Sequence, residues 1–132
     1  MSVAAQMIET NPTSTGYSPE DLAECIEACF ACAQACTACA DACLGEDMVV
    51  ELRRCITTDL DCADVCAATG RVLSRQTSFD SAMTIAALTA CREACRICAS
   101  ECKGHAEHMQ HCQVCAQACQ RCEQACARLL EP

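Results

Sequence analysis

The chain has 132 residues and a mass of 14.1 kDa, which is the size of one compact domain. Eighteen residues are cysteine and only three are aromatic, so we do not expect a core built from large side chains. Nine Lys and Arg against 18 Asp and Glu give a net charge of −9, which argues against nucleic-acid binding and against an anionic membrane surface. The N-terminus lacks the basic and apolar regions of a secretory signal, and no apolar run has the length of a membrane span. These features predict a cytoplasmic protein or one whose signal has been removed, and the initiating Met1 favours the first.

The first segment, residues 1–17, contains a short apolar patch from Val3 to Ile8. A stretch rich in Pro, Gly, Ser and Thr follows it. We interpret this segment as an N-terminal tail with room for one short helix docked on the rest of the chain. The remaining residues, 18–130, are expected to form a single helical domain.

The first long helix is predicted to begin after Ser18, because Ser-Pro-Glu-Asp provides an N-cap, a first-turn proline and an acidic residue at the third position. Gly45 is suited to end this helix. Asp47 can cap the second helix, and Gly70 is expected to end or weaken that helix near Thr69.

The third helix is predicted to open near Ser78, with Asp80 in its first turn, and to close at Gly104. The fourth helix is predicted to run from about residue 105 to residue 130 and to stop at Pro132. The first, third and fourth helices would each have about 26 residues. Matched lengths and short connections favour neighbouring helices that run up, down, up and down.

The cysteines follow the same four helices. Within each group, successive cysteines are 3, 4 or 7 residues apart, which is the spacing of a helix seam that faces other helices. The four groups are Cys25, Cys29, Cys32, Cys36, Cys39 and Cys43; Cys55, Cys62 and Cys66; Cys91, Cys95, Cys98 and Cys102; and Cys112, Cys115, Cys119, Cys122 and Cys126. The pattern predicts an all-α protein, an antiparallel up-down-up-down four-helix bundle with thiols where Leu would normally stand.

Three explanations for these thiols do not involve metal. Free cysteine packs as a small apolar residue, but eighteen in register would give a thin core. Neighbouring cysteines on one helix have Cβ atoms about 5–6 Å apart, which is too far for a disulfide. Disulfides are also not expected in a chain without a secretory signal. A thiol redox protein could use a CxxC pair such as Cys29/Cys32 or Cys95/Cys98, although no βαβ pattern surrounds either pair. We keep this redox protein as an alternative.

A metal-filled interior explains the pattern better, and charge favours Cu(I). Ionised thiols in an interior need cations beside them, and no Lys or Arg lies between the cysteines on these seams. One monovalent soft ion per thiolate gives a neutral interior, and thiolates select Cu(I). Zinc leaves two negative charges at each four-cysteine site, so broad Zn/Cd sequestration is the second alternative. A di-iron bundle would need Glu-x-x-His motifs, which the chain lacks, and iron–sulfur proteins carry separate four-cysteine sets.

The cysteine motifs resemble those of a known family. The first helix carries Cys-x-x-Cys-Ala-x-Ala-Cys, the third carries Cys-x-x-x-Cys-x-x-Cys-x-x-x-Cys, and the fourth carries a continuous ladder. Over about residues 18–130, the chain is similar to the bacterial cysteine-rich four-helix-bundle copper storage proteins. The resemblance implies a cytosolic homotetramer in which each bundle holds many Cu(I) ions along its axis. Many Cu(I) ions in one interior indicate storage or buffering rather than enzymatic turnover, and a copper chaperone is a candidate partner.

Three histidines lie where one end of the bundle is expected. His108 is four residues before Cys112 and His111 is four before Cys115, so both are expected to lean towards the thiols. His105 is seven residues before Cys112 and would extend the same line. The histidines either are solvated residues of a first helical turn or form a mouth that admits copper. The resemblance, which places histidines at an open bundle end, favours the mouth.

Asp59 occupies a position where the ladder of the second helix skips a cysteine, four residues after Cys55 and three before Cys62. An Asp at this position either faces solvent or, if buried, must meet metal or hydrogen-bond donors. Met48 is expected to pack in the core, with a thioether ligand as the alternative. The opposite end of the bundle is expected to be closed by apolar residues: Leu22, Ile85, Leu88 and Leu129.

Overall fold

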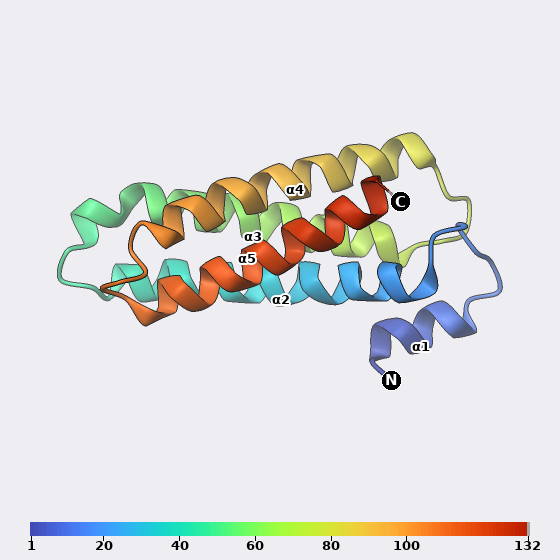
Figure 1. The fold of residues 1–132 in the computed structure, drawn as a ribbon, viewed down its shortest axis with the longest axis horizontal. Coiled ribbons are helices and arrows are strands. Elements are labelled where there is room, and N and C mark those ends of the chain that lie inside the picture. The colour runs from blue at the N-terminus through green and yellow to red at the C-terminus, as the bar shows by residue number, and fades with distance from the viewer. Residues whose placement is uncertain (132) are drawn as a thin grey trace.

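The computed structural model describes residues 1–131, in which all regular secondary structure is helical. The helices are α1 (Val3–Thr10), α2 (Pro19–Leu44), the short 3-10 helix η1 (Val49–Leu52), α3 (Arg53–Ser74), α4 (Ser81–Lys103) and α5 (Gln110–Leu130). Helix α2 packs against α3 and α5, and α4 packs against the same two helices. Figure 1 shows these long helices side by side, with the α2–α3 and α4–α5 connections at one end and the α3–α4 connection at the other.

The signals at the ends of α2 and at the end of α4 act as predicted. The Ser18 hydroxyl accepts a hydrogen bond from the backbone N–H of Asp21, and Pro19 opens α2. Gly45 ends α2, and Gly104 ends α4. Capping of this kind satisfies backbone groups that have no partner inside the helix, so it defines where each helix stops.

The second long helix differs from its prediction at both ends. Asp47 does not cap it; the turn of η1 intervenes, and α3 begins at Arg53 without a side-chain cap. Gly70 does not end it either, because α3 continues to Ser74. Gly70 instead permits close packing, since a Cβ atom there would lie 2.9 Å from Cζ of Phe30 on α2. The glycine therefore marks a helix–helix contact.

The third and fourth long helices begin later than predicted. Ser78 has a φ of 57°, in the left-handed region, so it lies outside the helix, and Asp80 caps α4. After Gly104 the chain forms turns, in which the N–H of His105 bonds to the carbonyl of Cys102. Helix α5 therefore starts only at Gln110, and the lengths of α2, α4 and α5 are 26, 23 and 21 residues. Pro132, expected to stop the last helix, lies outside the described residues.

The core changes its composition along the axis. Thiols dominate it from the α2–α3 and α4–α5 connections to beyond its middle, and a group of leucines is buried at the opposite end. Leu22, Leu88 and Leu129 are buried there as predicted, and Leu73 joins them. Ile85 was expected in this group but is half exposed, because it lies on the outer side of α4.

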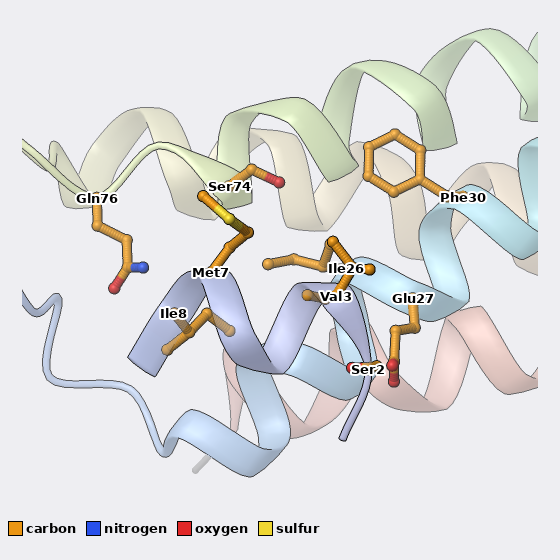
Figure 2. A pocket seen from close by; sticks show the side chains of 10 residues that line it. Ser2, Val3, Met7, Ile8, Ile26, Glu27, Phe30, Ser74 and Gln76 are labelled. Carbon is orange, nitrogen blue, oxygen red and sulfur yellow. The ribbon is translucent and has the colours of Figure 1, made fainter. Parts of the chain in front are cut away.

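The N-terminal segment forms a short helix against the rest of the chain. Ser2 caps α1 by accepting a hydrogen bond from the N–H of Ala5, and α1 packs on α2 without burying any residue completely. A cavity of about 460 Å³ lies between α1 and the neighbouring helices, and Figure 2 shows Met7, Ile26 and Phe30 among its lining residues. No cysteine lines this cavity, so it is separate from the thiol core.

Helix α2 is the most apolar of the long helices. By length and composition alone it could cross a membrane, although the sequence was expected to hold no such segment. Half of its most apolar stretch is buried inside the protein, as is typical of a core helix. Its apolar character therefore fits packing against α3 and α5.

Candidate metal-binding core

All 18 cysteines are free thiols that point into the core, and none is more than 2% exposed. This burial follows from the heptad spacing, which places each group on the inner side of its helix. A thiol redox enzyme needs a reactive thiol that a substrate can reach. The CxxC pairs of this chain, including Cys29/Cys32 and Cys95/Cys98, are inaccessible, which weighs against that alternative.

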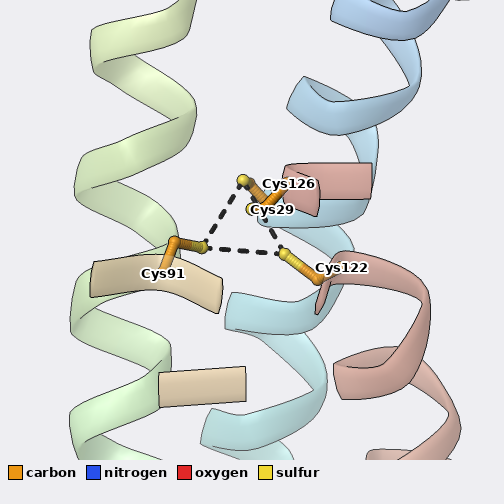
Figure 3. A group of neighbouring side chains, drawn as sticks. All are labelled: Cys29, Cys91, Cys122 and Cys126. Carbon is orange, nitrogen blue, oxygen red and sulfur yellow. Dashed lines mark hydrogen bonds between the residues drawn. The ribbon is translucent and has the colours of Figure 1, made fainter. Parts of the chain in front are cut away.

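The thiols form one continuous network across the helices. The Sγ atoms of Cys66 and Cys95 are 3.5 Å apart, and Cys119 lies 3.6 Å from both Cys32 and Cys36. These distances exceed the roughly 2.05 Å of a disulfide, so the thiols touch without being bonded. Several sets of four have all their ligand atoms within 4.8 Å of one another. One such set joins α2, α4 and α5 (Figure 3): Cys29, Cys91, Cys122 and Cys126.

Burial favours the protonated form of two thiols near the end where α2 and α4 finish. Burial raises the pKa of Cys43 to about 11 and also raises the pKa of Cys112. No Lys or Arg is among the buried residues of the described chain. Thiolates formed in this interior must therefore be neutralised by the metal ions themselves, which favours many monovalent soft ions.

Asp59 lies inside the thiol network and is fully buried. Its Oδ1 atom is 3.0 Å from Sγ of Cys98, 3.3 Å from Cys115 and 3.5 Å from Cys102. Burial, together with the neighbouring Cys98, raises the pKa of Asp59 to about 9. The solvent-facing alternative is thus wrong, and the carboxyl group offers an oxygen among sulfur ligands.

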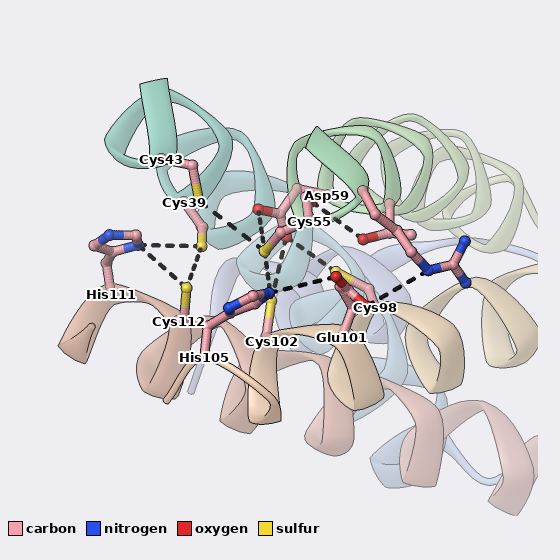
Figure 4. A network of polar contacts seen from close by, with 12 residues as sticks. Cys39, Cys43, Cys55, Asp59, Cys98, Glu101, Cys102, His105, His111 and Cys112 are labelled. Atoms are coloured by element: carbon pink, nitrogen blue, oxygen red, sulfur yellow. Dashed lines mark hydrogen bonds and ion pairs between the residues drawn. The ribbon is translucent and has the colours of Figure 1, made fainter. Parts of the chain in front are cut away.

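His111 joins the thiols at the end where α2 and α4 finish. Its Nδ1 atom is 3.3 Å from Sγ of Cys39 and 3.6 Å from Sγ of Cys112, and Figure 4 shows the ring beside these two thiols. With Cys43 these residues form a compact group of candidate ligands. His111 therefore lies at the end of the bundle where the mouth is predicted.

His105 and His108 are placed differently from His111. The Nε2 atom of His105 lies 3.4 Å from a carboxylate oxygen of Glu101 (Figure 4). The Glu101 carboxylate also pairs with Arg54 at 3.5 Å. His108 is exposed. The prediction that His108 leans towards the thiols and that His105 extends their line is wrong, because it assumed a helix from residue 105, whereas α5 begins at Gln110.

Other residues at this end differ from expectation or were missed. Met48 is 43% exposed, so it is not the packed core residue that was predicted. Met109 is buried and directly precedes α5. Glu46 and Glu101 each face a histidine ring. For Glu101 a sequence signal existed, since it lies four residues before His105; for Glu46 the contact depends on the tertiary fold.

The comparison with known protein families agrees with these observations. A sequence model of the copper storage protein family matches residues 18–131. The chain belongs to the copper storage protein family. A relative from Bacillus subtilis, the uncharacterized cysteine-rich protein YhjQ, is 42% identical over 102 residues, which are 77% of this chain and 89% of the relative. The resemblance inferred from the cysteine motifs is thus confirmed.

Solved structures of a Streptomyces lividans protein are similar to this chain. The copper storage protein Ccsp, loaded with 10 copper equivalents, matches with a TM-score of 0.94 and 53% identity over 96% of this chain and 97% of that chain. A structure described as a cytosolic copper storage protein with five coppers matches with a TM-score of 0.84 and 57% identity, over 86% of this chain and 94% of that chain.

Proposed function

We propose that this member of the copper storage protein family stores Cu(I) in the cytoplasm, on thiolates that face the interior of one helical bundle. The observation that carries the proposal is the network of 18 buried thiols, with no Lys or Arg buried among residues 1–131. Only positive ions of the cargo can balance the charge of these thiolates. The copper-loaded Streptomyces relatives and the cytosolic description of one of them support the same function.

The scaffold that we infer is an antiparallel up-down-up-down four-helix bundle over residues 18–130, preceded by the tail of residues 1–17. The packing of α2 and α4 against both α3 and α5 supports this topology, as do connections that alternate between the two ends (Figure 1). The family match begins at residue 18, which supports the boundary. Short connections then bring all four cysteine groups onto one axis.

The proposed ligands are the 18 cysteines, assisted by Asp59 and by the three histidines. Asp59 and His111 contact thiols directly, which supports a role in the first clusters that form. We place the mouth at His105, His108 and His111, because the other end buries leucines and offers an arriving ion no histidine or methionine among the buried side chains that the structure describes there. His108, which is exposed, would meet an ion outside the core.

Storage without catalysis fits thiols that are all buried, because a substrate could not reach an ion bound among them. The same groups of four thiols could also hold Zn(II) or Cd(II), which is the remaining alternative. A four-coordinate divalent ion leaves net negative charge in the core, however, whereas Cu(I) at one ion per thiolate does not. Charge therefore favours Cu(I).

The experiment that tests storage is an anaerobic titration of the reduced, metal-free chain with Cu(I) against a competing chelator. We expect saturation near one ion per cysteine, that is, near 18 ions per chain. Saturation at a handful of ions would contradict storage. A parallel titration with Zn(II), followed by Cu(I), decides between the metals: Cu(I) should displace Zn(II) completely. Thiol counting without reductant checks that the cysteines stay free.

We further propose that the chain forms a homo-oligomer, most simply the tetramer that the family resemblance implies. The outer side of α2 is exposed and carries no charge over Phe30, Ala31, Gln34, Thr37 and Ala38. Chains with a net charge of −9 repel one another, so an uncharged face is where copies can meet. We propose a copper chaperone as the partner that exchanges Cu(I) with this protein, and we propose neither nucleic acid nor a membrane as a binding partner. Light scattering at micromolar concentration tests the assembly.

A further inference from the structure

Two histidines at the mouth are related to carboxylates in the same way. The Nε2 atom of His111 lies 3.5 Å from Oε1 of Glu46, and the Nε2 atom of His105 lies 3.4 Å from Oε1 of Glu101. The two carboxylates come from different elements, since Glu46 follows α2 and Glu101 lies in the last turns of α4. The same ring atom therefore faces a carboxylate at two independent places.

The other ring atom of His111 faces the thiols. Its Nδ1 lies 3.3 Å from Sγ of Cys39 and 3.6 Å from Sγ of Cys112. Its Nε2 is buried and has no hydrogen bond within the described residues, although Glu46 is the carboxylate beside it. A neutral imidazole carries one N–H, so a proton on Nε2 leaves the Nδ1 lone pair free for a metal ion.

We propose that Glu46 and Glu101 are positioning residues, which accept the Nε2–H of His111 and His105, and that Glu46 thereby leaves Nδ1 of His111, which faces the thiols, free to bind Cu(I). This proposal rests on the proposed storage function and adds residues outside the thiol core to it. A histidine that binds metal commonly donates its other N–H to a carboxylate, which fixes both the tautomer and the ring orientation.

The two carboxylates are held to different degrees. The Glu101 side chain is 22% exposed and is anchored by Arg54 on α3, so it ties α3, α4 and the α4–α5 connection together at the mouth. The Glu46 side chain is 35% exposed and can rotate the short distance needed to accept the His111 proton. Glu46 is the better site for a test, because its replacement removes no ion pair with an arginine.

The first measurement needs no copper. Long-range ¹H–¹⁵N spectra of the reduced, metal-free chain report the tautomer of each of its three histidines. In the wild type at neutral pH, His111 is expected as the Nε2–H tautomer, and exposed His108 serves as an internal reference for a free ring. Glu46→Ala should shift His111 towards a mixture of tautomers. Glu46→Gln should keep the Nε2–H tautomer, because the amide carbonyl still accepts the proton.

The second measurement is the affinity of the mouth for Cu(I), from competition with a chelator under anaerobic conditions. Removal of a carboxylate behind a histidine ligand typically weakens a metal site by about 10–100-fold, so Glu46→Ala should weaken the sites filled through His111 by at least about 10-fold. Glu46→Gln should restore most of that loss. Glu51→Ala is the matched control, since Glu51 is exposed on η1 of the same connection and faces no histidine.

The outcomes separate this proposal from the storage function. Normal total capacity with an unchanged His111 tautomer and unchanged affinity in Glu46→Ala would overturn the positioning role alone. If Glu46→Gln were as weak as Glu46→Ala, the charge of Glu46 would matter rather than ring orientation, and the positioning role would again be overturned. A wild-type capacity of only a few ions would overturn storage itself.

Discussion

The Oδ1 atom of Asp59 lies 3.0 Å from Sγ of Cys98, at the one level of the second cysteine group where heptad spacing leaves a gap. A carboxyl group thus replaces a thiol in the wall of the core. In the metal-free protein it sits among thiols with no cation beside it, and this controls the pH at which it ionises.

Asp59 should make the stability of the metal-free chain depend on pH. Its pKa rises from 3.8 to about 9 on folding, so the folded chain keeps a proton that the unfolded chain loses as the pH rises above about 4. This contribution to stability is present below pH 4 and is lost progressively up to about pH 9. Asp59→Asn should therefore be more stable than wild type at pH 7, by at most about 4 kcal/mol.

Urea unfolding of the reduced, metal-free variants at pH 4 and pH 7 measures this effect. The difference between Asp59→Asn and wild type should almost vanish at pH 4. Asp61→Asn, an exposed neighbour on α3, should show no such dependence. Lower stability of Asp59→Asn at pH 7 would mean that the carboxyl group is stabilising as an anion.

The histidines should control the rate of copper uptake rather than the capacity. Replacing His105, His108 and His111 by leucine should slow uptake and removal while total binding stays almost unchanged, because the thiolates supply the sites. Among single variants, His111→Ala should have a larger effect than His108→Ala, since only His111 contacts thiols. Stopped-flow loading measures both. A triple variant that loads at the wild-type rate would place the mouth elsewhere.

Removal of copper should leave the helices intact. The caps at Ser18 and Asp80 and the leucines at the end opposite the histidines stabilise the helices without metal. Small metal domains differ, because they fold only when their ligands bind the ion. Far-ultraviolet circular dichroism of the reduced, metal-free chain should therefore show a helical spectrum close to that of the loaded chain. A random-coil spectrum would show that copper drives folding.

Gly70 should be energetically coupled to Phe30. In a helix interior, Gly→Ala alone usually stabilises by about 0.5–1 kcal/mol, but here the new Cβ would lie 2.9 Å from the Phe30 ring. Gly70→Ala should therefore raise the free energy of unfolding in a Phe30→Ala background. In the wild-type background it should raise that free energy by less, or lower it. A double-mutant cycle by urea unfolding should give a coupling of about 1 kcal/mol. Additive effects would show that the ring moves aside freely.

Much of the core could be predicted from the sequence, because heptad spacing alone determines which side of a helix is buried. This explains why all cysteines lie inside and why the gap at Asp59 holds a buried group. The start of α5 could not be predicted, since Met109 precedes it without a side-chain cap and the turns from His105 carry no distinctive signal. The exposure of His108 follows from that connection. The contact of Glu46 with His111 joins the α2–α3 connection to α5, and so depends on tertiary structure.

The leucines at one end of the core have a consequence for the order in which stored ions are returned. Cys25 and Cys126, whose Sγ atoms are 3.8 Å apart, lie next to Leu22 and Leu129. If ions pass only at the histidine end, the ions bound by this pair of thiols lie behind all the other bound ions. The ions that bind last, near His111, are then released first. A brief shortage of copper removes only these ions, and the ions at Cys25 and Cys126 are released only after prolonged depletion.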